Sequence, residues 1–417
     1  MNDASETPEP AASCHGFPVV ANRLQLGGRP LGHLAEVLGR TPFYAYDRQR
    51  IAARVAELRA ALPGGWELHY AVKANPMPAL VQALAGWVDG LDVASAGELR
   101  TALDTGIDPA RISFAGPGKR EEEISQAVAA GIVINLESER ELRLAAAHGA
   151  RLGLRPAVAL RVNPDFTMPG AAARMGGGAR QFGVDAEQAG ELLRAMHTLP
   201  VEFMGFHLYF GSQNLRADGI ARSQAQAVEL AVRLAADAPG PVRLLNLGGG
   251  FGIPYFPGEK PLDLAALSIE MHRLAAEIAE RLPEARPVLE LGRYLVGEAG
   301  AYVCRVIDRK LSRGEVFLVT DGGLHHHLAA SGNFGQVLRR NYPVVLADRV
   351  APDTAHPLET VQVVGPLCTS LDLLGDRLAL PRAEVGDLVA VLASGAYGLS
   401  ASPQQFLGHP PALEALA

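Results

Sequence analysis

The stretch HYAVKANP, residues 69–76, places one lysine, Lys73, at the end of an apolar, β-prone run that Asn75-Pro76 then terminates. An ammonium is costly to bury without a partner, so such a lysine reaches solvent, pairs with an acid or serves in chemistry. Lysine amines are covalent nucleophiles toward carbonyl compounds. Lys73 is therefore the first candidate catalytic residue.

A glycine-rich turn and an arginine, both far along the chain, have the chemistry to hold a phosphate. The turn is LGGGFG at 247–252, and Arg293 belongs to LELGRY at 289–294. Glycines expose backbone N–H groups, and a guanidinium binds phosphate through two parallel hydrogen bonds. A glycine triplet by itself is equally typical of a tight turn. The two segments together favour a phosphate cradle.

Glu290 lies in the same LELGRY segment as this arginine. A lysine, a phosphate cradle and a carboxylate together predict pyridoxal 5'-phosphate as the cofactor. The lysine would bind the cofactor's aldehyde, and the carboxylate would keep the pyridine nitrogen protonated. The protonated ring then accepts the electrons released at the substrate α-carbon. Because an arginine at this nitrogen suits racemisation, the acid favours decarboxylation.

Lys73, the glycine-rich turn, Glu290 and Arg293 would lie close together if the chain forms an α/β fold with a (β/α)8 TIM barrel. From Asp47 onward, short apolar runs alternate with helix-like stretches such as 47–62. Eight alternating units over about 240 residues match such a barrel in number and length, and barrel enzymes build their sites at the carboxyl ends of the strands. The expected strands are 66–72, 91–94, 111–114, 131–135, 157–162, 203–208, 242–247 and 287–290.

Further polar residues lie in or just beyond these expected strands, so they gather at one predicted rim. They are Asp92, Arg161, Asn163, His207, Tyr209 and Ser212. Some have an ordinary structural explanation. Asp92 is also explained as an acid at a strand end, and Ser95 with Glu98 fits a helix capping box better than a catalytic pair.

After Arg293 the alternation stops, and a second, all-β domain is expected. Segments such as EVFLVTDG and GDLVAVLASG are β-rich and separated by turns. We assign residues 47–287 to the barrel and residues 17–46 with 288–417 to the β-domain, because the N-terminal strands precede the barrel and are expected to complete that domain. Residues 1–16, which are acidic and contain proline, are expected to form a disordered tail.

Composition excludes several classes of protein. The 417 residues are 48% hydrophobic and 20% charged, which is enough for a sizeable core, and the net charge of −7 argues against nucleic-acid binding. Three distant cysteines do not form a disulfide framework, and no apolar run reaches the ~18 residues of a membrane span. The N-terminal residues lack the apolar core of a signal peptide. A cytoplasmic protein without membrane or nucleic-acid partners is expected.

The sequence resembles the fold-type III pyridoxal-phosphate decarboxylases, the ornithine/diaminopimelate/arginine decarboxylase family. The resemblance covers about residues 40–400 and is carried, in order, by YAVKANP, DVASAGEL, HLYFGSQ, LGGGFG, ELGRYLVG, GPLCTSLD and SGAYG. It implies a barrel plus a β-domain, and a head-to-tail homodimer with shared active sites. It also implies that Lys73 holds the cofactor and that Glu290 holds the proton on its ring nitrogen.

The same resemblance implies roles for further residues. Cys368 and its neighbours would enter the active site of the partner subunit, where Cys368 would return a proton to the α-carbon. The phosphate would be bound by Ser212, Gly250, Gly292, Arg293 and Tyr397. The rest of the expected cofactor site comprises Lys73, Asp92, Arg161, His207, Tyr209, Gly248, Gly249 and Glu290.

The sequence departs from the family pattern at three positions. Tyr209 replaces a histidine whose ring stacks on the cofactor, so an aromatic face is kept without an imidazole. Leu291 stands where proline is usual. Thr369 follows Cys368 where the family usually carries an acid that pairs with the distal amine of the substrate. The missing carboxylate argues against ornithine or lysine and weakens the case for diaminopimelate.

Two other stretches, 174–185 and 321–343, resemble one branch of the family, which contains decarboxylases associated with exosortase systems and the glutamyl-carrier-protein decarboxylase of butirosin biosynthesis. Arg339 and Arg340, in the second stretch, suit a carboxylate or a phosphopantetheine phosphate better than an ammonium, and so are candidate substrate residues together with Thr369. Consecutive histidines, such as 325–327 here, cannot all face one ion from a regular element, so no metal is expected.

The prediction is a pyridoxal-phosphate-dependent α-decarboxylase of an L-amino acid or amino-acyl substrate, with an acidic distal end or a tether to an acyl-carrier protein. Diaminopimelate decarboxylase, acting in lysine biosynthesis, stays open as an alternative. An alternative of another class is a catalytically silent homologue that binds a partner protein. The chain keeps all of the leading site candidates, which argues against a catalytically inactive protein. These residues are Lys73, Glu290, Arg293, Cys368 and Tyr397.

Overall fold

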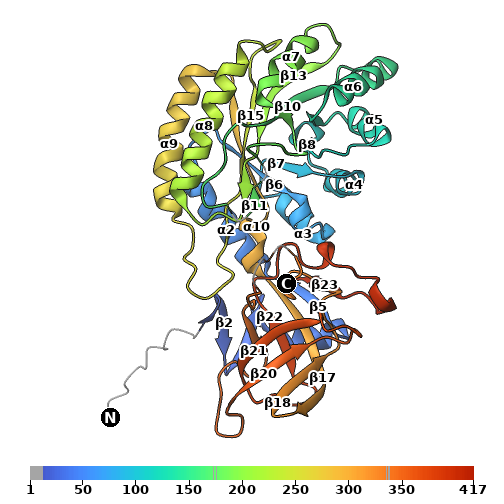
Figure 1. Ribbon diagram of the computed structural model, residues 1–417, viewed down its shortest axis with the longest axis vertical. Coiled ribbons are helices and arrows are strands. Elements are labelled where there is room, and N and C mark those ends of the chain that lie inside the picture. Colours follow the sequence, from blue (N-terminus) through green and yellow to red (C-terminus); the bar gives the residue numbers. More distant parts are fainter. Residues whose placement is uncertain (1–12, 172, 175, 335, 337–338) are drawn as a thin grey trace, which may run out of the picture. The chain divides into compact units, whose positions relative to one another are not determined.

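The computed structural model describes residues 13–171, 173–174, 176–334, 336 and 339–417. The chain forms two compact units (Figure 1). The barrel unit comprises Ala52–Pro254 and Glu259–Leu295. The β unit comprises the chain up to Ile51, the short segment Tyr255–Gly258, and Val296–Ala417.

Eight parallel strands of the barrel unit close on themselves in the order β6, β7, β8, β9, β10, β13, β15, β16. The predicted (β/α)8 barrel is thus confirmed, and every expected strand overlaps an observed one. A ninth, two-residue strand, β12 (Val184–Asp185), adds to β10. The barrel strands are β6 (Glu67–Ala71), β7 (Gly90–Val93), β8 (Ile112–Phe114), β9 (Val133–Leu136), β10 (Ala157–Asn163), β13 (Glu202–Leu208), β15 (Leu244–Gly249) and β16 (Arg286–Leu291).

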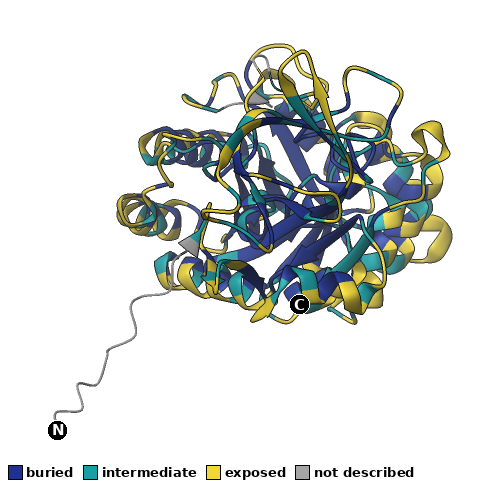
Figure 2. Ribbon diagram, turned by 90° about the horizontal axis from the view of Figure 1, so that it is seen from below, coloured by how far each residue is buried: buried dark blue, intermediate teal, exposed yellow. Residues whose placement is uncertain are grey.

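Helices cover the outside of this barrel, so its strands are buried on both faces and consist of nearly continuous apolar runs. Figure 2 shows the strands in dark blue, while the helices carry yellow, exposed faces. Among the described helices, none is long and apolar enough to cross a membrane. The helices of the alternating region are α2 (Arg48–Ala61), α3 (Pro78–Ala85), α4 (Ala96–Asp104), α5 (Glu121–Ala130), α6 (Glu139–Leu152), α7 (Ala186–Met196), α8 (Ala217–Ala235), α9 (Leu264–Arg281) and the short α10 (Arg293–Val296).

The start of α4 shows how local sequence sets these helix ends. Ser95 Oγ accepts a hydrogen bond from the Glu98 N–H at 3.2 Å, and Glu98 Oε2 accepts one from the Ala94 N–H at 2.7 Å. These contacts satisfy backbone donors that a helix N-terminus leaves open. The pair therefore caps α4, which is the reading that the sequence pattern favoured.

The β unit is built on a mainly antiparallel sheet, in the order β19-β22-β17-β18-β20-β21. β5 (Phe43–Tyr46) lies between β17 and β23, antiparallel to the first and parallel to the second, so the N-terminal region completes this sheet. The other strands are β17 (Gly300–Ser312), β18 (Glu315–Thr320), β19 (Val344–Leu346), β20 (Leu358–Val364), β21 (Leu373–Pro381), β22 (Leu388–Val391) and β23 (Leu413–Leu416).

A small four-stranded sheet and one helix share the core of the β unit. Phe17 and Leu24 of the small sheet pack in one buried cluster with Phe43 of β5 and Val303 of β17. These elements are β1 (Ser13–Cys14), β2 (Phe17–Val20), β3 (Arg23–Leu26), β4 (Arg29–Pro30) and α1 (Leu31–Leu38).

Three expected boundaries need correction. The limit placed after residue 287 falls inside β16, which is a barrel strand, and the barrel unit extends to Leu295. The first limit lies within α2, after Ile51, rather than before it. Of the tail expected over 1–16, residues 1–12 lie outside the described residues, whereas Ser13–Cys14 pair with β2 as a strand.

Candidate active site

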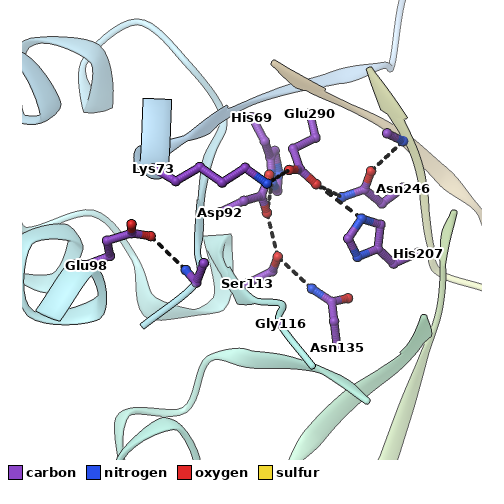
Figure 3. A network of polar contacts seen from close by, with 12 residues as sticks. His69, Lys73, Asp92, Glu98, Ser113, Gly116, Asn135, His207, Asn246 and Glu290 are labelled. Carbon is purple, nitrogen blue, oxygen red and sulfur yellow. Dashed lines mark hydrogen bonds and ion pairs between the residues drawn. The ribbon is translucent and has the colours of Figure 1, made fainter. Parts of the chain in front are cut away.

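Strand β6 places Lys73 beside a buried acid. The strand ends at Ala71, and Val72–Ala74 continue as one turn of 3-10 helix. The Lys73 Nζ atom lies 4.0 Å from Oε1 of Glu290, in β16, and 5.5 Å from the ring centre of Tyr209. The Lys73 side chain is 38% exposed and that of Glu290 only 6% (Figure 3). The amine is therefore accessible to a reactant, while the carboxylate is held in the barrel.

Positive and polar groups surround Glu290. Its Oε2 lies 3.2 Å from Nε2 of His207 and accepts a hydrogen bond from Nδ2 of Asn246 at 3.4 Å. Burial alone would raise the pKa of this carboxyl group, but the contact with His207 and the charges of Lys73 and Arg161 outweigh it and hold the pKa well below its usual range. Glu290 is thus a buried carboxylate at neutral pH.

A second line of polar side chains crosses β6 to β9 (Figure 3). Nδ1 of His69 lies 3.3 Å from Oδ1 of Asp92, which also accepts a hydrogen bond from the Ser113 hydroxyl. The Ser113 oxygen in turn accepts one from Nδ2 of Asn135 at 3.0 Å. Each strand contributes one inward-pointing residue, so neighbouring strands bring the four together.

His69 is the charged member of this line. Burial lowers its pKa, but Asp92 and Glu67 on its two sides raise it, and the net result is a pKa of about 10. Gly90, opposite His69 in the register, makes room for the ring, because a Cβ there would lie 2.4 Å from Nε2. An imidazolium is therefore built into the barrel four residues before Lys73.

Several buried polar atoms of the barrel have no hydrogen-bond partner within the part of the chain that the structure describes. Those inside the barrel cluster include both ring nitrogens of His207, Oδ2 of Asp92 and Oδ1 of Asn135. The 3.2 Å approach of His207 Nε2 to Oε2 of Glu290 is thus a close polar contact without hydrogen-bond geometry. Because buried polar groups are nearly always satisfied, the cluster indicates a site that a polar group from outside completes.

Arg161 is held by Glu137, a buried acid that directly follows the neighbouring strand β9. Its Nη1 donates to Oε1 of Glu137 at 2.8 Å, and the same carboxylate accepts the N–H groups of Gly116 and Gly183. Burial raises the pKa of Glu137, but the charges of Arg161 and Lys119 outweigh it and the pKa is lowered. Arg161 is therefore a fixed positive charge with an ionised partner.

Close backbone packing requires the glycines at the end of β15. A Cβ on Gly249 would lie 2.1 Å from the carbonyl oxygen of Glu290, and a Cβ on Gly250 would lie 2.2 Å from that of Gly211. Gly250 also has a φ of 75°, which side chains disfavour. The Gly248 N–H donates to Oδ1 of Asn246 at 2.8 Å, so this backbone donor is already used.

Comparison with known proteins decides what kind of site this is. The family model described as the pyridoxal binding domain of pyridoxal-dependent decarboxylases matches residues 48–297. The chain belongs to this family. L-glutamyl-[BtrI acyl-carrier protein] decarboxylase of Niallia circulans is 40% identical over 379 residues, which cover 90% of this chain and 88% of that protein. Diaminopimelate decarboxylase of Methanothermobacter thermautotrophicus is 32% identical over 392 residues, 91% of this chain and 87% of the relative.

Solved structures of the family agree with this assignment. Diaminopimelate decarboxylase of Helicobacter pylori, complexed with L-lysine, has a TM-score of 0.80 at 29% identity, covering 92% of this chain and 94% of that one. The enzyme from M. jannaschii, also with L-lysine, has a TM-score of 0.86 at 26% identity, covering 96% and 92%. The chain is therefore a pyridoxal-phosphate-dependent decarboxylase of amino-acid metabolism, as the sequence predicted.

The remaining predicted site residues of the barrel unit include Ser212, Gly292 and Arg293. Ser212 lies in β14 (Gly211–Ser212), which pairs with β11 (Ala173–Arg174). Arg293 begins α10. A Cβ on Gly292 would lie 2.7 Å from that of Ala74, so this glycine lets the turn that carries Lys73 pack closely.

The other predicted site residues of the decarboxylase belong to the β unit. Cys368 is exposed, and Thr369 Oγ1 accepts a hydrogen bond from the Leu371 N–H at 3.3 Å. Tyr397 has a φ of 53°, in the left-handed region that an aromatic residue rarely adopts. Strained backbone of this kind is concentrated at functional sites.

The three consecutive histidines are part of the core of the β unit. Nε2 of His326 lies 2.9 Å from the Pro410 carbonyl oxygen, and Nε2 of His327 lies 2.8 Å from the Ser394 hydroxyl. The rings of His325 and His326 are 3.7 Å apart. In the part of the chain that is described, no group of three or more potential metal-binding side chains is present.

Sequence reasoning missed five residues of the barrel cluster. Ser113, Asn135 and Asn246 are each the polar residue of a short, otherwise apolar strand, as Asn135 is in VINL and Asn246 in LLNLGG. A single polar residue at an inward position of a buried strand is the signal that could have found these three. His69 shares its strand with Glu67, and Glu137 directly follows β9. The missed residues are His69, Ser113, Asn135, Glu137 and Asn246.

Proposed function

We propose that this decarboxylase acts on an L-amino acid whose distal end is acidic or is joined by a thioester to an acyl-carrier protein. The observation that carries the proposal is the chemistry beside Cys368. Thr369 is uncharged, and the next acid, Asp372, is 3% exposed and accepts the N–H groups of Leu324 and Leu367. A distal ammonium needs a carboxylate once water is excluded, and residues 368–372 offer none that is available.

The relative from Niallia circulans, whose name specifies an L-glutamyl group on an acyl-carrier protein, supports this substrate class. A glutamyl group joined to the carrier through its side-chain carboxyl keeps a free α-amino and α-carboxyl group at one end and has no ammonium at the other. Its distal side needs no carboxylate from the enzyme, which agrees with Thr369 and with the engaged Asp372.

The barrel residues fit pyridoxal phosphate through their chemistry. When bound, the cofactor supplies an electron sink for the charge left as carbon dioxide departs. The accessible amine of Lys73 is the group that would bind its aldehyde. Glu290, ionised and buried, would hold the proton on the ring nitrogen. The orphaned nitrogens of His207 and the fixed charge of Arg161 would provide further contacts with its polar groups.

Cys368 is proposed to return a proton to the α-carbon in the active site of the partner subunit, which requires a homodimer. We also propose that the enzyme works in the cytoplasm. Lys73→Ala and Cys368→Ala proteins, each impaired, are expected to regain about a quarter of wild-type activity after subunit exchange, because half of the dimers are then mixed and each has one intact site. Exchange without recovery would contradict the shared site.

The substrate proposal is tested by steady-state rates for glutamyl-carrier thioester, L-glutamate, meso-diaminopimelate and L-ornithine. The thioester is expected to have the highest kcat/KM and ornithine no measurable turnover. A second candidate is diaminopimelate decarboxylase, favoured by relatives of that name at 32% identity. Turnover of meso-diaminopimelate with kcat/KM above ~10⁴ M⁻¹s⁻¹ would establish that function instead.

A further inference from the structure

A cleft of about 520 Å³ opens in the β unit. Its volume is within the range of small-molecule sites. One wall comes from the loop of Arg339 and Arg340, and another from the strand β21. The lining residues are His15, Phe256, Pro257, Arg339–Val344 and Asp376–Leu378.

Positive charge dominates this cleft. Three guanidinium groups, of Arg339, Arg340 and Arg377, line it together with one carboxylate, Asp376. That carboxylate lies 3.7 Å from Nη2 of Arg377. The whole chain carries a net charge of −7, so the cleft is locally basic on an acidic protein. Such a site selects an anion.

The arginines of the cleft are held in different ways. Arg339 donates from Nη1 to the Ser331 carbonyl at 2.6 Å and from Nη2 to the Leu373 carbonyl, and no carboxylate of the described chain lies within 4.0 Å of it. The guanidinium of Arg340 stacks 3.7 Å from the ring centre of Phe256. Both planar groups are therefore pre-oriented, which lowers the entropy lost when they bind a ligand.

Aromatic rings give the cleft an apolar side. The Tyr342 ring lies 6.1 Å from that of Phe256 and 4.9 Å from that of Tyr255. Basic groups next to aromatic rings suit a ligand that has an anionic end and a partly apolar arm. A free inorganic anion would leave the aromatic side uncovered.

The cleft is joined by hydrogen bonds to the segment that follows Cys368. Asn341 Nδ2 donates to the Asp376 carbonyl at 2.7 Å, and the Asp376 N–H donates to Asn341 Oδ1 at 2.9 Å. Asn333 Nδ2 donates to the Leu371 carbonyl at 3.4 Å. A ligand seated in the cleft would thus lie along the same stretch of chain that carries the proposed proton donor.

We propose that this cleft binds the phosphodiester of a 4'-phosphopantetheine arm that carries the amino-acyl substrate. The guanidinium groups of Arg340 and Arg377 contact the phosphate, Arg339 adds its fixed charge, and the arm packs on Phe256 and Tyr342. The inference rests on the proposed function, because only a carrier-linked substrate has such an arm.

The test compares S-glutamyl-4'-phosphopantetheine with S-glutamyl-pantetheine, which lacks the phosphate, on the holoenzyme. Wild type is expected to prefer the phosphorylated thioester by about tenfold or more in kcat/KM, mainly through KM, as for a charge-assisted contact. In Arg340→Gln, and in Arg377→Gln at a side chain that is 79% exposed, the ratio of kcat/KM between the two thioesters falls toward one. Arg313→Gln, in the exposed β17–β18 turn, is the matched control and keeps it.

Calorimetric titration provides a readout that does not depend on turnover. Wild-type holoenzyme is expected to bind 4'-phosphopantetheine at least tenfold more tightly than pantetheine, and Arg340→Gln to lose that difference. Equal rates and equal binding for phosphorylated and unphosphorylated compounds would overturn the cleft assignment while leaving thioester decarboxylation intact. Turnover of free amino acids with none of either thioester would overturn the proposed function itself.

Discussion

Histidines buried in the two units of this decarboxylase have opposite charge states. His69 of the barrel is 5% exposed and His327 of the β unit 0%. Burial opposes protonation of both, but Asp92 and Glu67 beside His69 raise its pKa to about 10. Around His327, no acid offsets burial, and the pKa falls to about 3. The residue type and the burial are alike, so the neighbours decide the charge.

This difference in charge state reflects the surroundings of the two histidines: polar and charged side chains inside the barrel, and a packed aromatic core in the β unit. Parallel barrel strands point polar and charged side chains at one another across the interior, as His69 and Asp92 show. In the β unit, the His327 ring lies 5.7 Å from that of Tyr44 and 5.6 Å from that of Tyr302. Its polar atoms are used by local partners, and the Ala330 N–H donates to Nδ1 at 3.2 Å. Such a histidine stabilises a core while remaining neutral.

The largest loss of activity is expected when the amine of Lys73 is removed from the barrel. Lys73→Ala should abolish measurable decarboxylation, because no other lysine in the described chain lies beside Glu290. Borohydride treatment of wild-type holoenzyme should remove the visible absorbance, and peptide mass spectrometry should find the pyridoxyl group on Lys73. A reduced adduct on a different lysine would refute the assignment.

A smaller but still large loss of kcat is expected from replacing the buried Glu290 of the barrel, and none from replacing a half-buried glutamate of the β unit. Glu290→Gln keeps the shape and removes the charge, so cofactor should still bind while kcat falls by ~10²-fold or more. Glu414, whose Oε1 accepts a hydrogen bond from the Tyr46 hydroxyl at 2.6 Å, is the matched control. Glu414→Gln should leave kcat near the wild-type value. Near-normal kcat in Glu290→Gln would remove its proton-holding role.

The smallest effects concern the pH dependence of stability. His327 is neutral when folded and has a pKa near 6.5 when unfolded, so acid favours unfolding from about pH 6.5 down to its folded pKa of about 3. His69 behaves oppositely. Its raised pKa contributes stability that is fully present below about pH 6.5 and is lost as pH rises through about 10.

Urea midpoints of wild type, His327→Gln and His69→Gln between pH 4.5 and 9.5 would measure these opposite trends. As pH falls, the urea midpoint of wild type should decrease relative to that of His327→Gln. As pH rises, the amount by which the wild-type midpoint exceeds that of His69→Gln should decrease. The slope for each group is at most about 1.4 kcal/mol per pH unit. Parallel pH profiles for wild type and both variants would contradict the two charge states.

Much of the fold could be predicted because it is encoded in local periodicity. Eight apolar runs alternating with amphipathic stretches indicate a barrel whatever the order of contacts in space. The boundary after residue 287 was wrong because β16 is a short apolar run that reads the same in either unit. Its membership depends on pairing with β6 and β15, which lie far away in the sequence.

The sequence by itself determined the barrel, the β-domain and the two leading catalytic candidates. Lys73 and Glu290 were recognisable because a charge in a buried strand is costly and is seldom kept without a use. The sequence did not reveal the polar partners of Glu290, because His207 and Asn246 approach its carboxylate from β13 and β15. Nor did it reveal that Asp372 is already engaged by backbone N–H groups.

Only the tertiary structure decided which charges meet. His69 faces Asp92 because β6 and β7 are parallel neighbours in a register that pairs His69 with Gly90 and Ala71 with Asp92. A shift of one residue would turn the imidazole to the other face of the strand and separate it from Asp92. Side-chain charge thus follows from strand order and register, and these are set by contacts between segments that local sequence patterns do not specify.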